Sequence, residues 1–93
     1  IVLCSKGYPD KYENNIELKK LNEIKLEKDN YIFHAGTKIE NSKIYSNGGR
    51  VLNFVIRSKN LKESRDKLIR VIEDLNWENG YFRKDIGFKI IEK

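Results

Sequence analysis

Residues 50–76, RVLNFVIRSKNLKESRDKLIRVIEDLN, contain a strand pattern followed at once by a helix pattern. In the first part, Leu52, Phe54 and Ile56 fall on one face of an extended chain, because side chains alternate along a strand. β-branched and aromatic residues, which favour strands, are frequent there. We therefore predict a strand over Arg50–Arg57 with that face in the core.

The second part of this stretch changes to a helical period. Asn60 precedes Glu63 by three residues, which is the spacing of a capping box at the start of a helix. Apolar residues then recur near the helical period and predict a helix that runs to about Asn76, with a core face made of Leu61, Leu68, Ile72 and Leu75.

Upstream, Ile1–Ser5 has the composition of a short strand, and a turn follows because glycine, proline and aspartate gather in residues 6–10. Residues 11–30 are highly charged and only weakly periodic. We interpret them as an irregular excursion attached to the core through five apolar anchors: Ile16, Leu18, Leu21, Ile24 and Leu26.

Further short strands surround the central stretch. Alternation predicts a strand over Tyr31–Thr37, a tight turn at Asn41-Ser42 and a return strand over Ile44–Ser46. After the helix, Asn79-Gly80 breaks the chain, and a last strand carries Ile86, Phe88 and Ile90 on one face. Four or five strands with one long helix predict an α+β fold, a small and mainly antiparallel sheet, and a single domain over residues 1–93.

Composition narrows the class of protein. With 39% hydrophobic and 35% charged residues, the chain has the make-up of a soluble globular domain, and no apolar run approaches the roughly 18 to 20 residues that a membrane span needs. Its one cysteine, Cys4, lies in an apolar run and fits a reducing cytoplasm. The net charge of +5 suits an anionic partner, but the lysines alternate with glutamates as on a solvated surface.

Gly48-Gly49-Arg50 is the leading candidate for a binding site. Paired glycines let backbone N–H groups approach an anion, and the adjacent arginine offers a planar fork for phosphate or carboxylate. A plain hairpin turn explains the same residues. A second candidate, Arg83-Lys84-Asp85, is either a surface ion pair or a pair of cations at an interface or substrate contact.

Other chemistry has little support. His34 is the only histidine, and we interpret it as structural, although a Cys4/His34 nucleophile pair is conceivable if their strands are neighbours. The sequence contains no phosphate-binding GxxxxGK[ST] loop, no GxGxxG and no His/Cys cluster with metal-ligand spacing. We therefore predict no catalytic residue and no metal ligand in this chain.

Three blocks in this order, His34-Ala35-Gly36-Thr37, Ser46-Asn47-Gly48-Gly49-Arg50-Val51-Leu52 and Tyr81-Phe82-Arg83-Lys84-Asp85-Ile86-Gly87, resemble the C-terminal domain of phosphoribosylamine-glycine ligases, which belong to the ATP-grasp class. The likeness also includes Gly7-Tyr8-Pro9 and Trp77. The chain departs from the family at Asn15-Ile16 and Lys20, where the family usually has a Gly-Asp pair and a second glycine.

The resemblance implies a part of a larger enzyme that uses ATP to join glycine to 5-phosphoribosylamine, giving glycinamide ribonucleotide, ADP and phosphate in purine biosynthesis. ATP and Mg or Mn would be bound by upstream N-terminal and ATP-grasp domains. This domain would pack on that core and complete the active site, with Gly48, Gly49 and Arg50 facing the substrate cleft and Arg83, Lys84 and Asp85 at the cleft edge or domain interface.

Two further points bear on this expectation. The chain has no methionine and begins in the apolar run Ile1-Val2-Leu3-Cys4, so we interpret it as a piece of a longer protein. The alternative function is a free-standing basic RNA-binding module, which the charge favours and the absence of an RNP1-like pattern disfavours.

Overall fold

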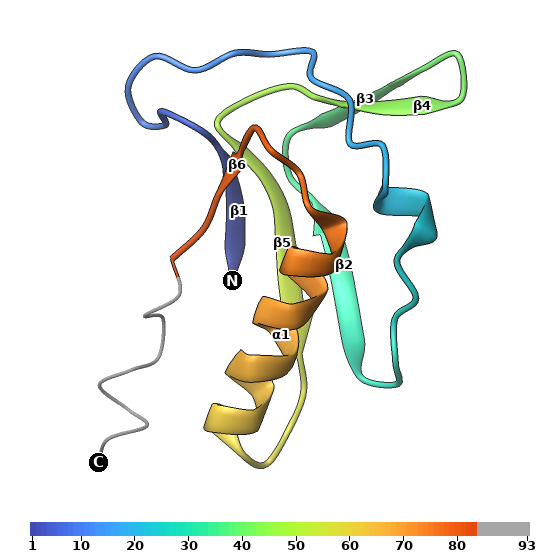
Figure 1. The fold of residues 1–93 in the computed structure, drawn as a ribbon, viewed down its shortest axis with the longest axis vertical. Coiled ribbons are helices and arrows are strands. Elements are labelled where there is room, and N and C mark those ends of the chain that lie inside the picture. Colours follow the sequence, from blue (N-terminus) through green and yellow to red (C-terminus); the bar gives the residue numbers. More distant parts are fainter. Residues whose placement is uncertain (84–93) are drawn as a thin grey trace.

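A computed structural model describes residues 1–83 of the chain. In this part the elements follow one another along the chain as shown in Figure 1. They are the strands β1 (Val2–Ser5), β2 (Asn30–His34), β3 (Thr37–Glu40), β4 (Lys43–Ser46), β5 (Arg50–Ile56) and β6 (Gly80–Tyr81), the short 3-10 helix η1 (Leu21–Glu23) and the helix α1 (Leu61–Leu75).

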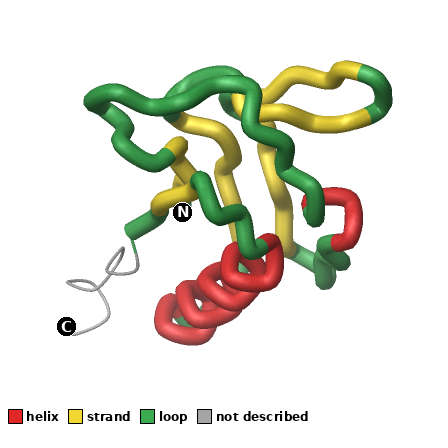
Figure 2. The backbone as a smooth tube through the Cα atoms, turned by 45° about the horizontal axis from the view of Figure 1, so that its top comes forward, coloured by secondary structure: helices red, strands yellow, loops and turns green. Residues whose placement is uncertain are grey.

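Four of the strands form one antiparallel sheet in the order β2-β5-β1-β6, and β3 and β4 form a separate antiparallel hairpin. The helix α1 lies across one face of the larger sheet (Figures 1 and 2). The predicted α+β class, a mainly antiparallel sheet with one long helix, is confirmed. Within residues 1–83 no helix is long and apolar enough to cross a membrane.

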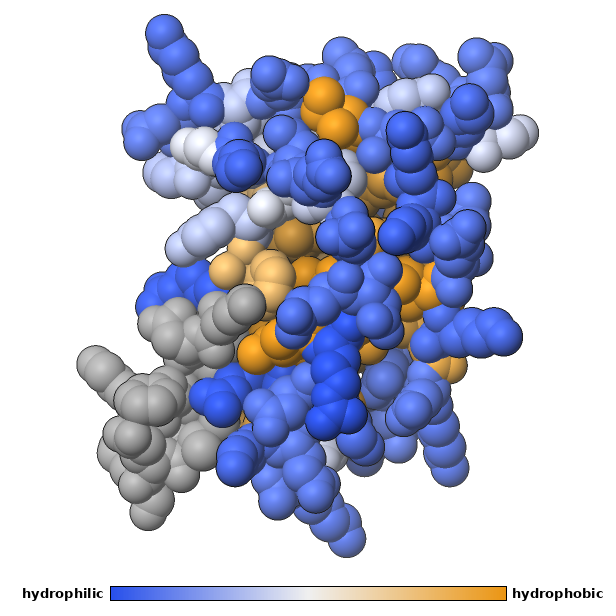
Figure 3. All heavy atoms as spheres, viewed as in Figure 1, coloured by the Kyte–Doolittle hydropathy of each residue, from blue (hydrophilic) through white to orange (hydrophobic). Residues whose placement is uncertain are grey.

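The core lies between α1 and the sheet. The strand β5 is central, and Leu52 and Phe54 are buried on its helix-facing side as predicted, with Ile56 partly buried beside them. The rest of the buried apolar cluster comes from β1, the excursion, β5 and α1: Leu3, Leu18, Leu21, Val51, Leu68, Ile72 and Leu75. Seen from the helix side, hydrophilic side chains surround a centre where hydrophobic ones show through (Figure 3).

The helix begins and ends where its caps require. The side chain of Asn60 accepts a hydrogen bond from the Glu63 N–H at 3.1 Å, and Asn76 ends the helix in the left-handed conformation with φ 46°. The prediction that Leu61 belongs to the core face is wrong, since it is 53% exposed. Ser64 is buried in the first turn instead, with its hydroxyl bonded to the Asn60 carbonyl oxygen.

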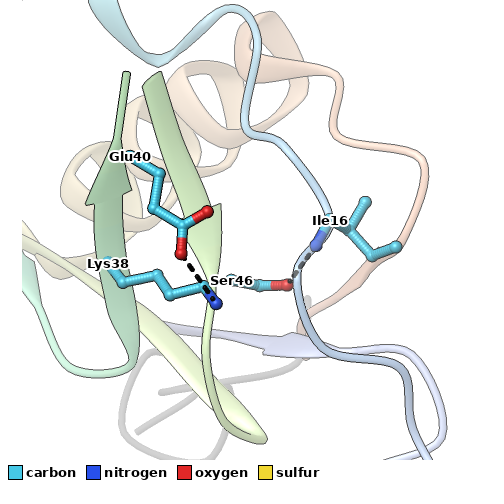
Figure 4. Close-up of polar contacts among 4 residues, drawn as sticks. All are labelled: Ile16, Lys38, Glu40 and Ser46. Atoms are coloured by element: carbon cyan, nitrogen blue, oxygen red, sulfur yellow. Dashed lines mark hydrogen bonds and ion pairs between the residues drawn. The ribbon is translucent and has the colours of Figure 1, made fainter. Parts of the chain in front are cut away.

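The excursion is attached to the hairpin and to the chain after the helix. The Leu18 N–H donates to the Ile44 carbonyl oxygen, and the indole N–H of Trp77 donates to the Glu17 carbonyl oxygen. The Ile16 N–H donates to the hydroxyl oxygen of Ser46, at 3.1 Å (Figure 4). Of the five predicted anchors, Leu18 and Leu21 are buried, whereas Leu26 is 44% exposed, so its prediction is wrong.

The predicted strand over Tyr31–Thr37 is two strands. The strand β2 ends at His34 because the Ala35 and Gly36 N–H groups both donate to the Val51 carbonyl oxygen, which turns the chain out of the sheet. Thr37 then begins β3, where Lys38 and Glu40 form an ion pair at 3.4 Å (Figure 4). The turn at Asn41-Ser42 is confirmed, with both residues at positive φ.

At the end of the chain, β6 was not predicted, because Gly80–Tyr81 is too short for a periodic pattern; it pairs with Cys4 and Ser5 of β1. The predicted strand around Ile86, Phe88 and Ile90 lies outside the described residues.

Candidate functional site at the end of the sheet

A β-bulge sets the direction of the Arg50 side chain. On β1 and β5, Leu3 is opposite Leu52, but the next residue, Cys4, is opposite Arg50, so Val51 is the extra residue of the bulge. In a regular strand without the bulge, Arg50 would share the helix-facing side with Leu52. The bulge turns Arg50 to the other face, where it is exposed beside Cys4.

The ring of Tyr8 lies beneath the arginine. The guanidinium carbon of Arg50 is 6.0 Å from the centroid of the Tyr8 ring, at the outer limit of a cation–π contact. The same ring packs so closely on Gly49 that a Cβ there would overlap it. Tyr12 flanks the other side, with ring centroids 6.0 Å apart. Glycine at position 49 is therefore required for Tyr8 to reach its place.

The backbone of the Gly48-Gly49 loop is held from two sides. The Ser5 hydroxyl donates to the Gly48 carbonyl oxygen at 2.9 Å, and the Ser5 N–H donates to the Gly49 carbonyl oxygen at 2.6 Å. The Gly48 N–H donates to Oδ1 of Asn14 at 2.8 Å. That N–H is thus occupied in this structure, whereas the Arg50 side chain is exposed and available to an anion.

The block His34-Ala35-Gly36-Thr37 packs against this loop. The Asn47 N–H donates to the Gly36 carbonyl oxygen at 2.8 Å, and a Cβ on Gly36 would overlap the Arg50 carbonyl oxygen. Only glycine allows this approach of two backbones. Nδ1 of His34 lies 2.8 Å from Oγ1 of Thr37 in a local turn contact, which fits its interpretation as a structural residue.

The neighbourhood of Arg50 extends to the second predicted group. An apolar cavity of about 290 Å³ is lined by Ile1, Val2, Cys4, Tyr8, Tyr81, Phe82 and Arg83. Tyr8 lies close to Arg50 and also borders the cavity that Arg83 lines, so these two predicted residues are both near Tyr8. Lys84 and Asp85 lie outside the described residues.

Two effects act in opposite directions on the pKa of the Cys4 thiol. Burial raises the pKa of the Cys4 thiol above its ordinary value, while the positive charge of Arg50 acts to lower it. The ion pairs Lys38–Glu40 and Arg65–Asp66 lie elsewhere, and within residues 1–83 no carboxylate pairs with Arg50. An exposed guanidinium without a carboxylate partner can take a phosphate or carboxylate from a ligand.

The Cys4/His34 pair is not formed. In the sheet order, β5 separates β1 from β2, and His34 is opposite Leu52 while Cys4 is opposite Arg50. Within the described residues no three His, Cys, Asp or Glu side chains are grouped so that they could hold a metal ion. The arrangement in residues 1–83 therefore offers anion recognition by Arg50.

Three residues that build this site were not among the predicted ones: Ser5, Tyr8 and Asn14. Tyr8 belongs to the Gly7-Tyr8-Pro9 block of the resemblance, so a signal for it existed. Ser5 and Asn14 contact the loop from 43 and 34 residues away along the chain, and no local pattern marks such contacts.

A small antiparallel sheet with one long helix defines a small α+β domain, with the Arg50 loop at the end of its sheet. Residues 1–89 match the family described as "Phosphoribosylglycinamide synthetase, C domain", and the chain belongs to this family.

Individual relatives of the chain are members of the same family of ligases. The chain is 37% identical over 93 residues to the phosphoribosylamine–glycine ligase of Agrobacterium fabrum, covering 100% of this chain and 22% of that protein. It is 40% identical over 88 residues to the same-named ligase of Fusobacterium nucleatum, covering 94% and 21%. A "Bifunctional purine biosynthetic protein" of Dictyostelium discoideum is 40% identical over 92 residues, covering 98% and 11%.

A solved structure is similar as well. The crystal structure of phosphoribosylamine–glycine ligase from Thermotoga maritima matches with a TM-score of 0.70 and 32% sequence identity, covering 91% of this chain and 20% of that one. The chain therefore spans about a fifth of the length of most of these relatives, and it corresponds to their C-terminal domain.

Proposed function

We propose that residues 1–93 form the C-terminal domain of a longer enzyme, an ATP-dependent ligase that joins glycine to 5-phosphoribosylamine. The products would be glycinamide ribonucleotide, ADP and phosphate, in purine biosynthesis. The observation that carries this proposal is the family match over residues 1–89, together with relatives that are named phosphoribosylamine–glycine ligase. On this proposal the domain alone is not catalytic.

The domain would pack on the upstream N-terminal and ATP-grasp domains and close one side of the active site. Gly48, Gly49 and Arg50 would face the substrate cleft, where Arg50 binds an anionic group. Both proposed substrates supply one: glycine has a carboxylate and 5-phosphoribosylamine a phosphate, and the guanidinium fork binds either. Arg83, Lys84 and Asp85 would lie at the edge of the cleft or at the domain interface.

ATP and a divalent metal, Mg or Mn, belong to the upstream domains in this proposal. Residues 1–83 do not fit a metal site, because they hold no group of three candidate ligands, and the sequence has no glycine-rich phosphate loop of a known pattern. We propose a cytoplasmic location, which the unpaired Cys4 of this chain fits; a relative in Arabidopsis thaliana is named chloroplastic.

The test is the Arg50→Ala variant of the full-length protein, measured by glycine-dependent release of ADP. Loss of a charge-assisted hydrogen bond costs about 1.5–3 kcal/mol, which is a fall of roughly 10- to 150-fold in kcat/KM. Thermal unfolding should not change, because the Arg50 side chain is exposed. Arg70→Ala, at an exposed position of α1, is the matched control.

Equal kinetics of the Arg50→Ala variant and the unmodified enzyme would remove Arg50 from the site. Absence of any glycine-dependent ADP release from the unmodified full-length protein would contradict the proposed activity itself. The RNA-binding alternative has no support in the relatives reported above, which are named as ligases or as a purine biosynthetic protein.

A further inference from the structure

The face of the larger sheet opposite α1 has an unusual composition. Five large apolar side chains from four strands lie on it with exposed fractions between 39% and 56%. They are Val2 of β1, Tyr31 and Phe33 of β2, Val55 of β5 and Tyr81 of β6. We refer to these five residues as the open face.

The strand register makes the open face continuous. Tyr31 is opposite Val55, and Phe33 and Val2 are both opposite Asn53, from the two neighbouring strands. Tyr81 is opposite Cys4 in the same way. The rings of Tyr31 and Phe33 stack with centroids 6.1 Å apart and planes at 18°. The apolar surface therefore runs across the sheet from β2 to β6.

Charge is almost absent from this surface. In β1, β2, β5 and β6 the only charged side chain that shares the open face is Arg50, which the bulge places at its end, opposite Cys4; just beyond β6, Arg83 lines the cavity beside Val2 and Tyr81. When one face of an antiparallel sheet is exposed to water, the side chains on that face are normally polar. Aromatic enrichment and a lack of charge are instead typical of the buried centre of an interface.

We propose that the open face docks onto the part of the ligase chain that lies upstream of this domain. This inference rests on the proposed function. Most of the matched relatives are about five times as long as the chain, so a covering surface is available within one polypeptide. Contacts between domains of one chain commonly bury about 600–1,500 Å².

Two features of the structure support the upstream part of the ligase chain as the surface that covers the open face. Nucleic acid needs basic residues around stacking aromatics, and the positions of the open face beside Tyr31 and Phe33 carry none. Arg50 stands at the end of the open face, so docking there brings its guanidinium to the boundary between this domain and the upstream part, where a substrate cleft would form.

The test measures thiol labelling in the full-length ligase, read by peptide mass spectrometry so that other cysteines do not interfere. The Phe33→Cys variant probes the open face. The Ile39→Cys variant, at a 73% exposed position of the β3–β4 hairpin, is the control. The labelling rate of each variant in the folded protein is divided by the labelling rate of the same variant unfolded in urea. Docking predicts that the Phe33→Cys position reacts roughly tenfold or more slowly than the Ile39→Cys position.

Equal reactivity at the two positions would overturn the proposal. If the Phe33→Cys variant fails to fold, Val55→Cys on the same face replaces it. Protection that disappears when residues 84–93 are deleted would assign the cover to the chain's own end and also overturn the proposal. Protection that disappears on dilution to a monomer would assign it to a second copy, with the same consequence.

The labelling result is independent of activity. Protection in a protein without glycine-dependent ADP release would uphold docking and reject the proposed reaction. Full reactivity in an active enzyme would reject docking alone.

Discussion

Replacing Ser5 by alanine should loosen the loop that carries Arg50 and leave the rest of the sheet in place. Ser5 is fully buried, and its hydroxyl donates to the Gly48 carbonyl oxygen at 2.9 Å. A carbonyl that loses its partner in a mostly buried place costs about 1–2 kcal/mol. For a domain of this size that lowers the midpoint of thermal unfolding by roughly 4–16 °C.

Ser46→Ala is a closely matched control. Ser46 is also fully buried, and its hydroxyl oxygen accepts the Ile16 N–H at 3.1 Å, so a similar loss of stability is expected (Figure 4). That bond holds the excursion close to Asn14, whose Oδ1 accepts the Gly48 N–H, so exchange at Gly48 should become faster in both variants. Amide hydrogen exchange of the 93-residue chain should become faster at Arg50 in the Ser5→Ala variant only.

Two results would refute this reasoning. A Ser5→Ala variant that unfolds within about 1 °C of the unmodified chain would mean that the hydroxyl does not stabilise the loop. Faster exchange at Arg50 in both variants would mean that the loop responds to any loss of stability, and that its bond to Ser5 has no special role in holding it.

Three shorter predictions follow from other contacts. Asn15 has φ 62°, so Asn15→Ala should destabilise the chain by about 1 kcal/mol while Asn15→Gly leaves denaturant unfolding nearly unchanged; equal losses would contradict this. Asn60→Ala removes the cap of α1 and should cost about 1 kcal/mol, and an unchanged urea midpoint would show that the cap is dispensable. Arg50→Ala removes a charge that lowers the pKa of Cys4, so the pH midpoint of alkylation should rise, with Arg70→Ala as control; a fall would show the opposite sign.

Elements fixed by local sequence were predicted well. The helix is specified by its own cap and period, and β5 by alternation over seven residues, so both were found with bounds within about one residue. Asn15 takes the left-handed conformation, with φ 62°, which asparagine tolerates better than most residues.

Features that depend on distant contacts were missed. The end of β2 at His34 is set by the Val51 carbonyl oxygen, which takes two N–H groups from a segment sixteen residues earlier; alternation alone extends through Thr37. Leu61 fits the helical period, yet it lies at the first position of α1, beyond the region that the sheet covers, and is exposed. Periodicity specifies which face is apolar, and it does not specify how far the covering layer reaches.

The candidate site also combines a feature set by local sequence with one set by a distant contact. The sequence pointed to Gly48-Gly49-Arg50, but strict alternation along β5 would have put Arg50 on the helix-facing side with Leu52. One extra residue, Val51, reverses this and sets the arginine at the end of the open face, beside Cys4 and over Tyr8. The bulge therefore couples two proposals that were reached from separate observations. If the open face is covered by the upstream part of the ligase, Arg50 must lie at that boundary, and a substrate that it binds there would contact both parts of the enzyme.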